Sequence, residues 1–185
     1  MKILVVIDTQ NDFIDGALRN EEAIKRVPNI VNEIKNTDAD YIFLTKDTHY
    51  NQSYLNTMEG KKLPVKHCIE GSDGWQINKD IMEAVTLNNR NNWAIVHKNT
   101  FGYTGWKEKL EILKNTGYYW VLSEELEFEL VGYCTDICVI SNAMILKATF
   151  PNAKIEVKES CCAGVTEQSH KNALEAMKMC HIDII

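Results

Sequence analysis

Cys138 lies where an apolar segment passes into an amphipathic one, in the stretch Gly132-Tyr133-Cys134-Thr135-Asp136-Ile137-Cys138-Val139. This order places Cys138 in the first turn of a predicted helix, where partial positive charge and free N–H groups stabilise a thiolate and could hold an oxyanion. A buried structural cysteine and a Cys134/Cys138 metal pair are the alternatives. No further thiolate or imidazole follows nearby, so the residues favour Cys138 as a nucleophile.

Two charged residues follow other apolar segments. Asp8 comes directly after Ile7 and could act as a general base, or it could be an ordinary loop or cap aspartate. Lys98 follows segment 93–97, a position where a lysine is commonly just solvated. Because ligands bind beyond the carboxyl ends of the strands in an open parallel sheet, we predict that Asp8, Lys98 and Cys138 meet at that edge.

A third set of polar residues could bind a metal ion. Asp47 and His49 are separated by one residue after segment 41–45, and His67 follows further along the chain. On an extended backbone Asp47 and His49 point to the same side. One carboxylate and two imidazoles suit zinc, iron or manganese and leave coordination positions open. Loop histidines that bind no metal are the alternative.

Short apolar segments rich in β-branched residues alternate with amphipathic segments along the chain. The apolar segments are predicted strands buried on both faces: 3–7, 41–45, 93–97, 128–133 and 154–158. The amphipathic segments are predicted helices: 22–36, 76–87, 106–115, 137–149 and 167–180. This alternation predicts a three-layer α/β/α fold with a doubly wound, mostly parallel sheet. Segment 46–75 shows no such periodicity, and loops of that length are usually functional or disordered.

Composition narrows the class of protein. With 185 residues, 45% of them hydrophobic and 25% charged, we expect a single globular domain over 1–185. The net charge of −6, without a basic cluster, argues against nucleic acid and membrane-surface partners. The first apolar segment is too short for a signal peptide, and no segment reaches the length of a membrane span. Six cysteines without a secretory signal indicate reduced thiols and a cytoplasmic protein.

Taken together, these residues resemble the isochorismatase-like cysteine hydrolases, and within them the nicotinamidase (pyrazinamidase-type) branch. Three motifs in the correct order carry the resemblance over nearly the whole chain: Asp8-Thr9-Gln10-Asn11-Asp12-Phe13, the post-strand Lys98, and T-D-x-C-V at Thr135 to Val139. Three separated motifs are much more specific than any one of them. The resemblance implies the isochorismatase-like hydrolase fold and a catalytic triad of Asp8, Lys98 and Cys138.

The resemblance also implies an activity, which is hydrolysis of nicotinamide to nicotinic acid and ammonia through a cysteine thioester, as in NAD salvage and pyridine nucleotide biosynthesis. It implies an oxyanion hole from the backbone N–H groups of Cys134 and Cys138, and a cis Tyr133–Cys134 peptide bond. Alternatives are a related amidase acting on another carboxamide, carbamoyl or ureido compound, and a non-catalytic α/β protein with a structural Asp8–Lys98 ion pair. Vinyl-ether hydrolysis is less favoured because the isochorismatase branch lacks the nucleophilic cysteine.

For the metal, the resemblance implies one divalent ion, with zinc favoured over iron or manganese, held by Asp47, His49 and His67, and approached by Glu59 directly or through water. It assigns the aromatic pocket walls to Phe13 and Tyr103. The partner is a small carboxamide, and a homo-oligomer is one possible state. Two departures concern the substrate pocket: the segment Pro64-Val65-Lys66-His67-Cys68 has one extra residue, and Leu63 stands where many nicotinamidases have tryptophan.

Overall fold

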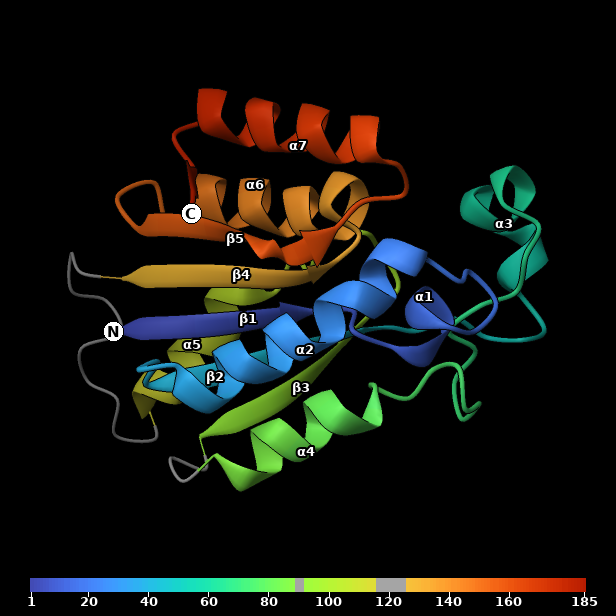
Figure 1. Cartoon of the computed structure of the whole chain (residues 1–185), viewed down its shortest axis with the longest axis horizontal. Coiled ribbons are helices and arrows are strands. Elements are labelled where there is room, and N and C mark those ends of the chain that lie inside the picture. Colours follow the sequence, from blue (N-terminus) through green and yellow to red (C-terminus); the bar gives the residue numbers. More distant parts are fainter. Residues whose placement is uncertain (89–91, 116–125) are drawn as a thin grey trace.

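A parallel sheet forms the centre of the computed structural model (Figure 1). Within residues 1–88, 92–115 and 126–185, which the structure describes, the sheet has six strands in the order β3-β2-β1-β4-β5-β6. Their bounds are β1 (Lys2–Ile7), β2 (Tyr41–Asp47), β3 (Trp93–Lys98), β4 (Glu127–Tyr133), β5 (Lys154–Ala163) and β6 (Asp183–Ile184). All neighbouring pairs are parallel, as the alternation of strands and helices predicts.

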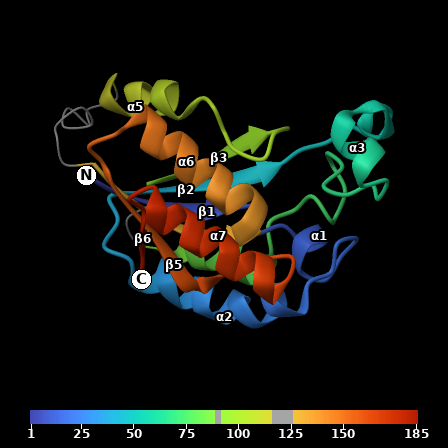
Figure 2. The same ribbon diagram turned by 90° about the horizontal axis from the view of Figure 1, so that it is seen from above.

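Helices cover both faces of the sheet (Figures 1 and 2). One face carries α2 (Glu21–Asn36) and α4 (Lys79–Leu87), and the other carries α5 (Trp106–Asn115), α6 (Ile140–Thr149) and α7 (Glu167–Met179). From Ile3 to Ile7, successive β1 side chains point alternately into these two layers, and all five are apolar because neither face of this part of the strand meets water. The predicted three-layer fold is confirmed. In the described part of the chain, no helix combines the length and apolar character needed to cross a bilayer.

The chain reverses its direction of travel across the sheet between β1 and β4. It starts at β1, moves outward through β2 to β3, and returns to the other side of β1 with β4. Ile7 pairs with Gly132 at the end of this central contact. Gly132 has φ 123°, and a Cβ there would lie 2.1 Å from the Ile7 carbonyl oxygen, so only glycine fits. This switch point opens a ligand-binding crevice beyond the strand ends.

Several element bounds differ from the prediction. α4 begins at Lys79 instead of 76, because the Asn78 side chain caps the N–H groups of the first turn. β5 continues to Ala163 instead of ending at 158, and β6 is too short for a pattern to reveal it. The predicted helix 137–149 starts as a π-helical turn, η2 (Thr135–Val139), which leads into α6. Cys138 therefore lies in a π turn and not in the first α-helical turn.

Segment 46–75 is largely ordered around short elements. β2 extends to Asp47, and the 3₁₀ turn η1 (Tyr54–Asn56) and α3 (Met58–Lys62) lie beyond the carboxyl end of the sheet (Figure 2). The His49 N–H donates to the Cys68 carbonyl at 2.9 Å, which ties the two ends of this segment together. Elements of three to five residues are too short to show helical periodicity.

A buried acid in the centre of β4 makes a pH prediction possible. Glu129 lies 3.3 Å from Lys2 and 3.9 Å from Lys158, yet burial and the neighbouring Glu33 charge raise its pKa. The folded state therefore favours the protonated acid. The protonated Glu129 therefore contributes fully to the stability of the fold below the pKa of an ordinary glutamate. This contribution is lost as the pH rises through the raised pKa of Glu129 in the folded state.

We expect Glu129→Gln to be more stable than wild type by about 1 kcal/mol near pH 8, with the difference shrinking toward about pH 4. Urea unfolding across this pH range measures the difference. Glu127→Gln, at an exposed position of the same strand, is the matched control and should stay within about 0.5 kcal/mol of wild type. A pH-independent effect at Glu129 would contradict the prediction.

Candidate active site

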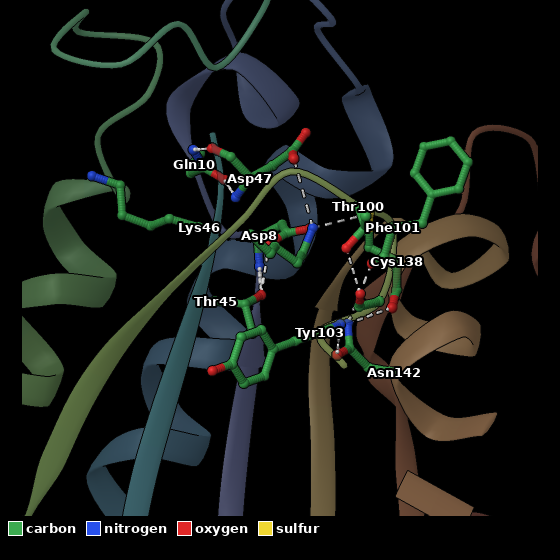
Figure 3. Close-up of polar contacts among 12 residues, drawn as sticks. Asp8, Gln10, Thr45, Lys46, Asp47, Thr100, Phe101, Tyr103, Cys138 and Asn142 are labelled. Carbon is green, nitrogen blue, oxygen red and sulfur yellow. Dashed lines mark hydrogen bonds and ion pairs between the residues drawn. The ribbon is translucent and has the colours of Figure 1, made fainter. Parts of the chain in front are cut away.

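Asp8 lies immediately after β1 in a left-handed backbone conformation, with φ 48°, which few non-glycine residues adopt. Its N–H donates to Thr45 Oγ1 at 3.1 Å, and its Oδ1 accepts from the same hydroxyl at 2.6 Å (Figure 3). The side chain is fully buried. Thr45 therefore fixes both the backbone and the carboxylate of Asp8 at the mouth of the sheet.

Lys98, the last residue of β3, lies among three acidic groups. Its Nζ is 2.6 Å from Asp8 Oδ2 and 3.8 Å from Asp47 Oδ1, and it donates to Cys138 Sγ at 3.8 Å. Burial lowers the pKa of Lys98, but interactions with the acidic groups of Asp8, Cys138 and Asp47 outweigh this effect and raise it overall. Lys98 is therefore an ammonium that bridges the carboxylate and the sulfur.

Cys138 is buried, and its resting form is the thiol. Burial is the main cause that raises its pKa well above the usual value, followed by the charge of Asp8, and Lys98 opposes both effects. Burial also raises the pKa of Asp8, Asp47 adds to this, and Lys98 lowers it in part. An aspartate with a raised pKa is a stronger proton acceptor than an ordinary one. Asp8 and Cys138 are thus arranged for proton transfer between them.

The turn that carries Cys138 is tied down on several sides. The expected cis peptide bond between Tyr133 and Cys134 is present. The Cys134 carbonyl accepts from the N–H groups of Ile137 and Val139 at 3.1 and 3.0 Å. The Asp136 carboxylate accepts from the Val165 N–H at 3.1 Å. These bonds hold the backbone amides of the turn in place behind the sulfur.

Asn142 is a site residue that the sequence analysis missed. Its Nδ2 donates to the Cys138 carbonyl at 2.8 Å, and its Oδ1 accepts from the Tyr103 N–H at 3.0 Å (Figure 3). The same Oδ1 accepts from Trp106 Nε1 at 3.1 Å. The residue is fully buried. A polar residue on the buried face of the predicted helix, one turn after Cys138, is the signal that could have identified it.

We expect Asn142→Leu to lower the free energy of unfolding by about 2–4 kcal/mol, because it leaves buried partners of three residues unpaired. Urea unfolding is the measurement. Asn172→Leu, at an exposed position of α7, is the control and should change stability by less than about 0.5 kcal/mol. Equal effects of the two substitutions would show that Asn142 does not hold the Cys138 turn.

Four side chains that could bind a metal meet beside Lys98. The ligand atoms of Asp47, His49, Glu59 and His67 all lie within 4.8 Å of one another. His49 Nε2 is 3.0 Å from Asp47 Oδ2, and His67 Nε2 is 3.5 Å from Glu59 Oε1. Within the described residues, this is the one such group of histidine, cysteine and acidic side chains, and it contains no cysteine. The alternative of a metal on Cys134 and Cys138 is therefore not supported.

The charges of this cluster fit a cation. Burial opposes protonation of the histidines, but hydrogen bonds to Asp47 and Glu59 prevail and raise the pKa of His49 to about 9 and of His67 to about 10. His67 Nδ1 donates to the Val65 carbonyl at 2.9 Å, so Nε2 faces the carboxylates. Positive charge between the carboxylates of Asp47 and Glu59 is therefore stabilising. A divalent ion can provide this charge in place of the protons on the histidines.

Two polar residues of the N-terminal motif, to which the sequence analysis gave no role, hold this cluster. Gln10 Oε1 accepts from the Asp47 N–H at 2.7 Å, and its Nε2 donates to the Asp47 carbonyl at 2.8 Å (Figure 3). Asp12 Oδ2 accepts from the Cys68 N–H at 2.7 Å, next to His67. Their positions inside a motif that carries the family resemblance were the available signal.

A cavity of about 1180 Å³ is lined by residues from both groups. Phe13, Asp47, Glu59, His67, Cys134 and Cys138 are among the residues that line it. Phe13 meets His67 edge-on at 5.6 Å between ring centroids, and Leu63 is also in the wall. The cavity therefore brings the sulfur, the possible metal ligands and an aromatic ring into one space.

Tyr103, the second expected pocket aromatic, lies in the packing between α5 and α6. Its ring packs edge-on against Trp106 at 5.2 Å, and its N–H is held by Asn142, so it belongs to the layer of α5 and α6. It does not line the cavity, whereas Phe101 of the same loop does. Figure 3 shows Phe101 and Tyr103 extending in opposite directions. Phe101 is therefore the aromatic residue of this loop that faces the cavity.

The fold and this site define a hydrolase with a cysteine beside an aspartate and a lysine at a parallel sheet edge. The family model of the isochorismatase domain matches residues 2–185. The chain therefore belongs to the isochorismatase domain family, as the three sequence motifs indicate.

The chain is also similar to individual nicotinamidases and pyrazinamidases. The nicotinamidase/pyrazinamidase of Mycobacterium tuberculosis (strain ATCC 25618 / H37Rv) is 24% identical over 196 residues, which cover 100% of this chain and 98% of that relative. The structure of the pyrazinamidase/nicotinamidase from Streptococcus mutans UA159 has a TM-score of 0.77 at 24% identity, with both chains fully covered. Pyrazinamidase of Pyrococcus horikoshii, in complex with zinc, has a TM-score of 0.70 at 21% identity and covers 100% of this chain and 98% of its own.

Proposed function

We propose that this protein hydrolyses nicotinamide to nicotinic acid and ammonia through a thioester on Cys138. The observation that carries the proposal is the position of Lys98 Nζ, 2.6 Å from Asp8 and 3.8 Å from Cys138, beside a cavity that Cys138 lines together with Asp47, Glu59 and His67 of the carboxylate and imidazole cluster. The triad of Asp8, Lys98 and Cys138 is suited to nucleophilic attack on a carbonyl carbon. The carboxylate and imidazole cluster is suited to holding a metal ion that binds a ring nitrogen. The names of the relatives support the same substrate.

The proposed reaction starts with a proton transfer. Asp8 takes the thiol proton of Cys138, and Lys98 stabilises the resulting thiolate while it attacks the carboxamide carbon. The backbone N–H groups of Cys134 and Cys138 stabilise the negative charge on the carbonyl oxygen. The C–N bond then breaks as Asp8 gives its proton to the departing ammonia. A nicotinoyl thioester remains on Cys138.

The second half of the reaction releases the acid. Asp8, again ionised, takes a proton from a water molecule, whose oxygen attacks the thioester carbon. The C–S bond breaks, nicotinic acid forms, and Asp8 returns its proton to the Cys138 sulfur. The same carboxylate thus serves as base and then as acid in each half of the reaction, which its raised pKa favours.

Asp47, His49, His67 and Glu59 would hold one divalent cation, with zinc favoured over iron or manganese. When bound, this ion supplies a Lewis-acid site for the pyridine nitrogen. The zinc complex of the Pyrococcus horikoshii relative supports this assignment. Phe13 and Phe101 would contact the ring. We further infer that the chain forms one domain and that the protein is a cytoplasmic enzyme of NAD salvage. A homo-oligomer is its proposed assembly state.

A related amidase activity on a carbamoyl or ureido compound is the second candidate. It shares the cysteine chemistry, but it gives no role to the cluster around His67. Ammonia release from nicotinamide, pyrazinamide, and a set of carbamoyl and ureido compounds distinguishes the two. We expect turnover of the two ring carboxamides. Turnover of only the non-aromatic compounds would overturn the proposal.

A further inference from the structure

The cavity that contains Cys138 extends beyond the catalytic groups. It continues past Cys134 to the first turns of α2 and α7, which begin on opposite faces of the sheet at the same end (Figure 1). We call this part the outer lobe, and its wall includes Arg19, Asn20, Arg26, Cys162, Thr166 and His170. Pockets for drug-sized ligands measure roughly 300–1,000 Å³. The whole cavity, at about 1180 Å³, therefore exceeds what one ring carboxamide needs.

Arg26 is a cation of the outer lobe without a partner. Its Nε is buried and makes no hydrogen bond within the described residues, where its guanidinium also forms no ion pair. The other cations beside it are already paired, Arg19 with Glu21 at 2.8 Å and Lys171 with Glu167 at 2.6 Å. A buried guanidinium N–H without an acceptor is costly. An anionic ligand would remove that cost.

Among the described residues, the nearby carboxylates form no ion pair with Arg26. Glu22, one turn before Arg26 on α2, pairs with Lys25 at 2.6 Å. Glu159 lies 3.8 Å from His170 Nε2. Arg26 therefore retains the charge and the planar donor geometry that match a carboxylate.

We propose that the outer lobe binds the carboxylate of an extended carboxamide, so that the enzyme also hydrolyses secondary carboxamides whose amine carries a carboxylate, with Arg26 as a specificity-determining residue. The orientation rests on the proposed function. In the proposed function the ring of the substrate lies at the His67 cluster, its carbonyl carbon lies at Cys138, and its carbonyl oxygen lies at the backbone amides. The amide nitrogen is then the atom from which the substrate can extend into the outer lobe.

The chemistry is that of the primary amide with a different leaving group. The Cys138 thiolate bonds to the carbonyl carbon, the C–N bond breaks, and Asp8 protonates the departing amine, which leaves as an amino acid. Water then hydrolyses the same thioester. No oxidant, reductant or further reactant is needed.

A series of nicotinoyl amides tests the inference. N-nicotinoylglycine, N-nicotinoyl-β-alanine and N-nicotinoyl-γ-aminobutyrate vary the distance to the carboxylate, and N-propylnicotinamide is the neutral control. Nicotinate release, followed by chromatography, gives kcat/KM for each compound and for nicotinamide. We expect at least one carboxylate compound to exceed N-propylnicotinamide by about tenfold or more in kcat/KM.

Variants assign the effect to Arg26. Arg26→Gln should lower kcat/KM for the preferred carboxylate compound by about tenfold, mainly through KM, and leave nicotinamide unchanged. Arg26→Lys should restore part of the loss, because it keeps the charge but not the planar donors. Arg19→Gln, which changes a lobe residue that is already paired, is the matched control and should behave as wild type.

The outcomes separate this inference from the proposed function. Turnover of nicotinamide without any preference for the carboxylate compounds in the wild-type enzyme would overturn the inference alone. No turnover of any nicotinoyl amide would overturn both. A preference that survives in a folded Arg26→Gln variant would overturn the role of Arg26.

Discussion

Cys138→Ala is expected to lower kcat/KM for nicotinamide by on the order of 10⁴-fold or more, because it removes the sulfur that Lys98 contacts and that forms the proposed thioester. Alanine leaves Asp8 and Lys98 paired at 2.6 Å and removes only the attacking atom. Ammonia release and mass spectrometry of the protein after rapid quenching measure the effect. Wild type should accumulate a nicotinoyl adduct on the peptide that contains Cys138, and the variant should not.

Cys180→Ala is the matched control for this prediction. Cys180 is exposed at the end of α7 and lies outside the cavity lining, so its replacement should leave turnover within about twofold of wild type. Iodoacetamide at neutral pH should inactivate wild type by modifying Cys138, because proton transfer to Asp8 exposes the thiolate to attack. Turnover that persists in Cys138→Ala would eliminate the covalent mechanism.

His67→Ala is expected to lower kcat/KM for nicotinamide by roughly 10–100-fold, chiefly through a higher KM. His67 is buried within the four-residue cluster, and its loss would leave two carboxylates with one imidazole between them. Orientation of the substrate is then lost while the thiol chemistry remains. Steady-state kinetics and metal content by elemental analysis are the measurements.

His181→Ala, at an exposed and distant position, is the control and should retain both metal and activity. Chelation of the wild-type protein should reproduce the His67→Ala kinetics without slowing the alkylation of Cys138, because the proposed ion orients the substrate and does not activate the sulfur. If chelation slowed alkylation and turnover equally, the cluster would act on the nucleophile instead.

Most of the fold could be predicted because the central strands are buried on both faces. Segments such as 3–7 are apolar throughout for that reason. The strand ends then place Asp8 and Lys98 at one edge by topology alone. Asp47 and His49 could be paired from their spacing on an extended backbone, whereas Glu59 was suggested only by the family resemblance. Its position depends on α3, a helix of five residues that leaves no periodic signal.

Other features depend on contacts between distant segments. The loop that carries Phe101 and Tyr103 is oriented by Asn142 and Trp106, so which aromatic ring enters the cavity is decided by tertiary hydrogen bonds. The π turn at Thr135–Val139 likewise has no sequence pattern of its own. That Arg26 Nε is buried without a hydrogen bond among the described residues likewise depends on the tertiary packing around α2 and cannot be read from the sequence.

The contact between Ile7 and Gly132 joins the two halves of the chain at the point where their chemistry meets. Asp8 follows one of these residues and the Cys138 turn follows the other. A partly folded chain that has assembled only β1, β2 and β3 would carry the aspartate and the lysine but lack the sulfur beside them. Turnover therefore reports that both halves have joined, which makes catalysis a sensitive probe of complete folding.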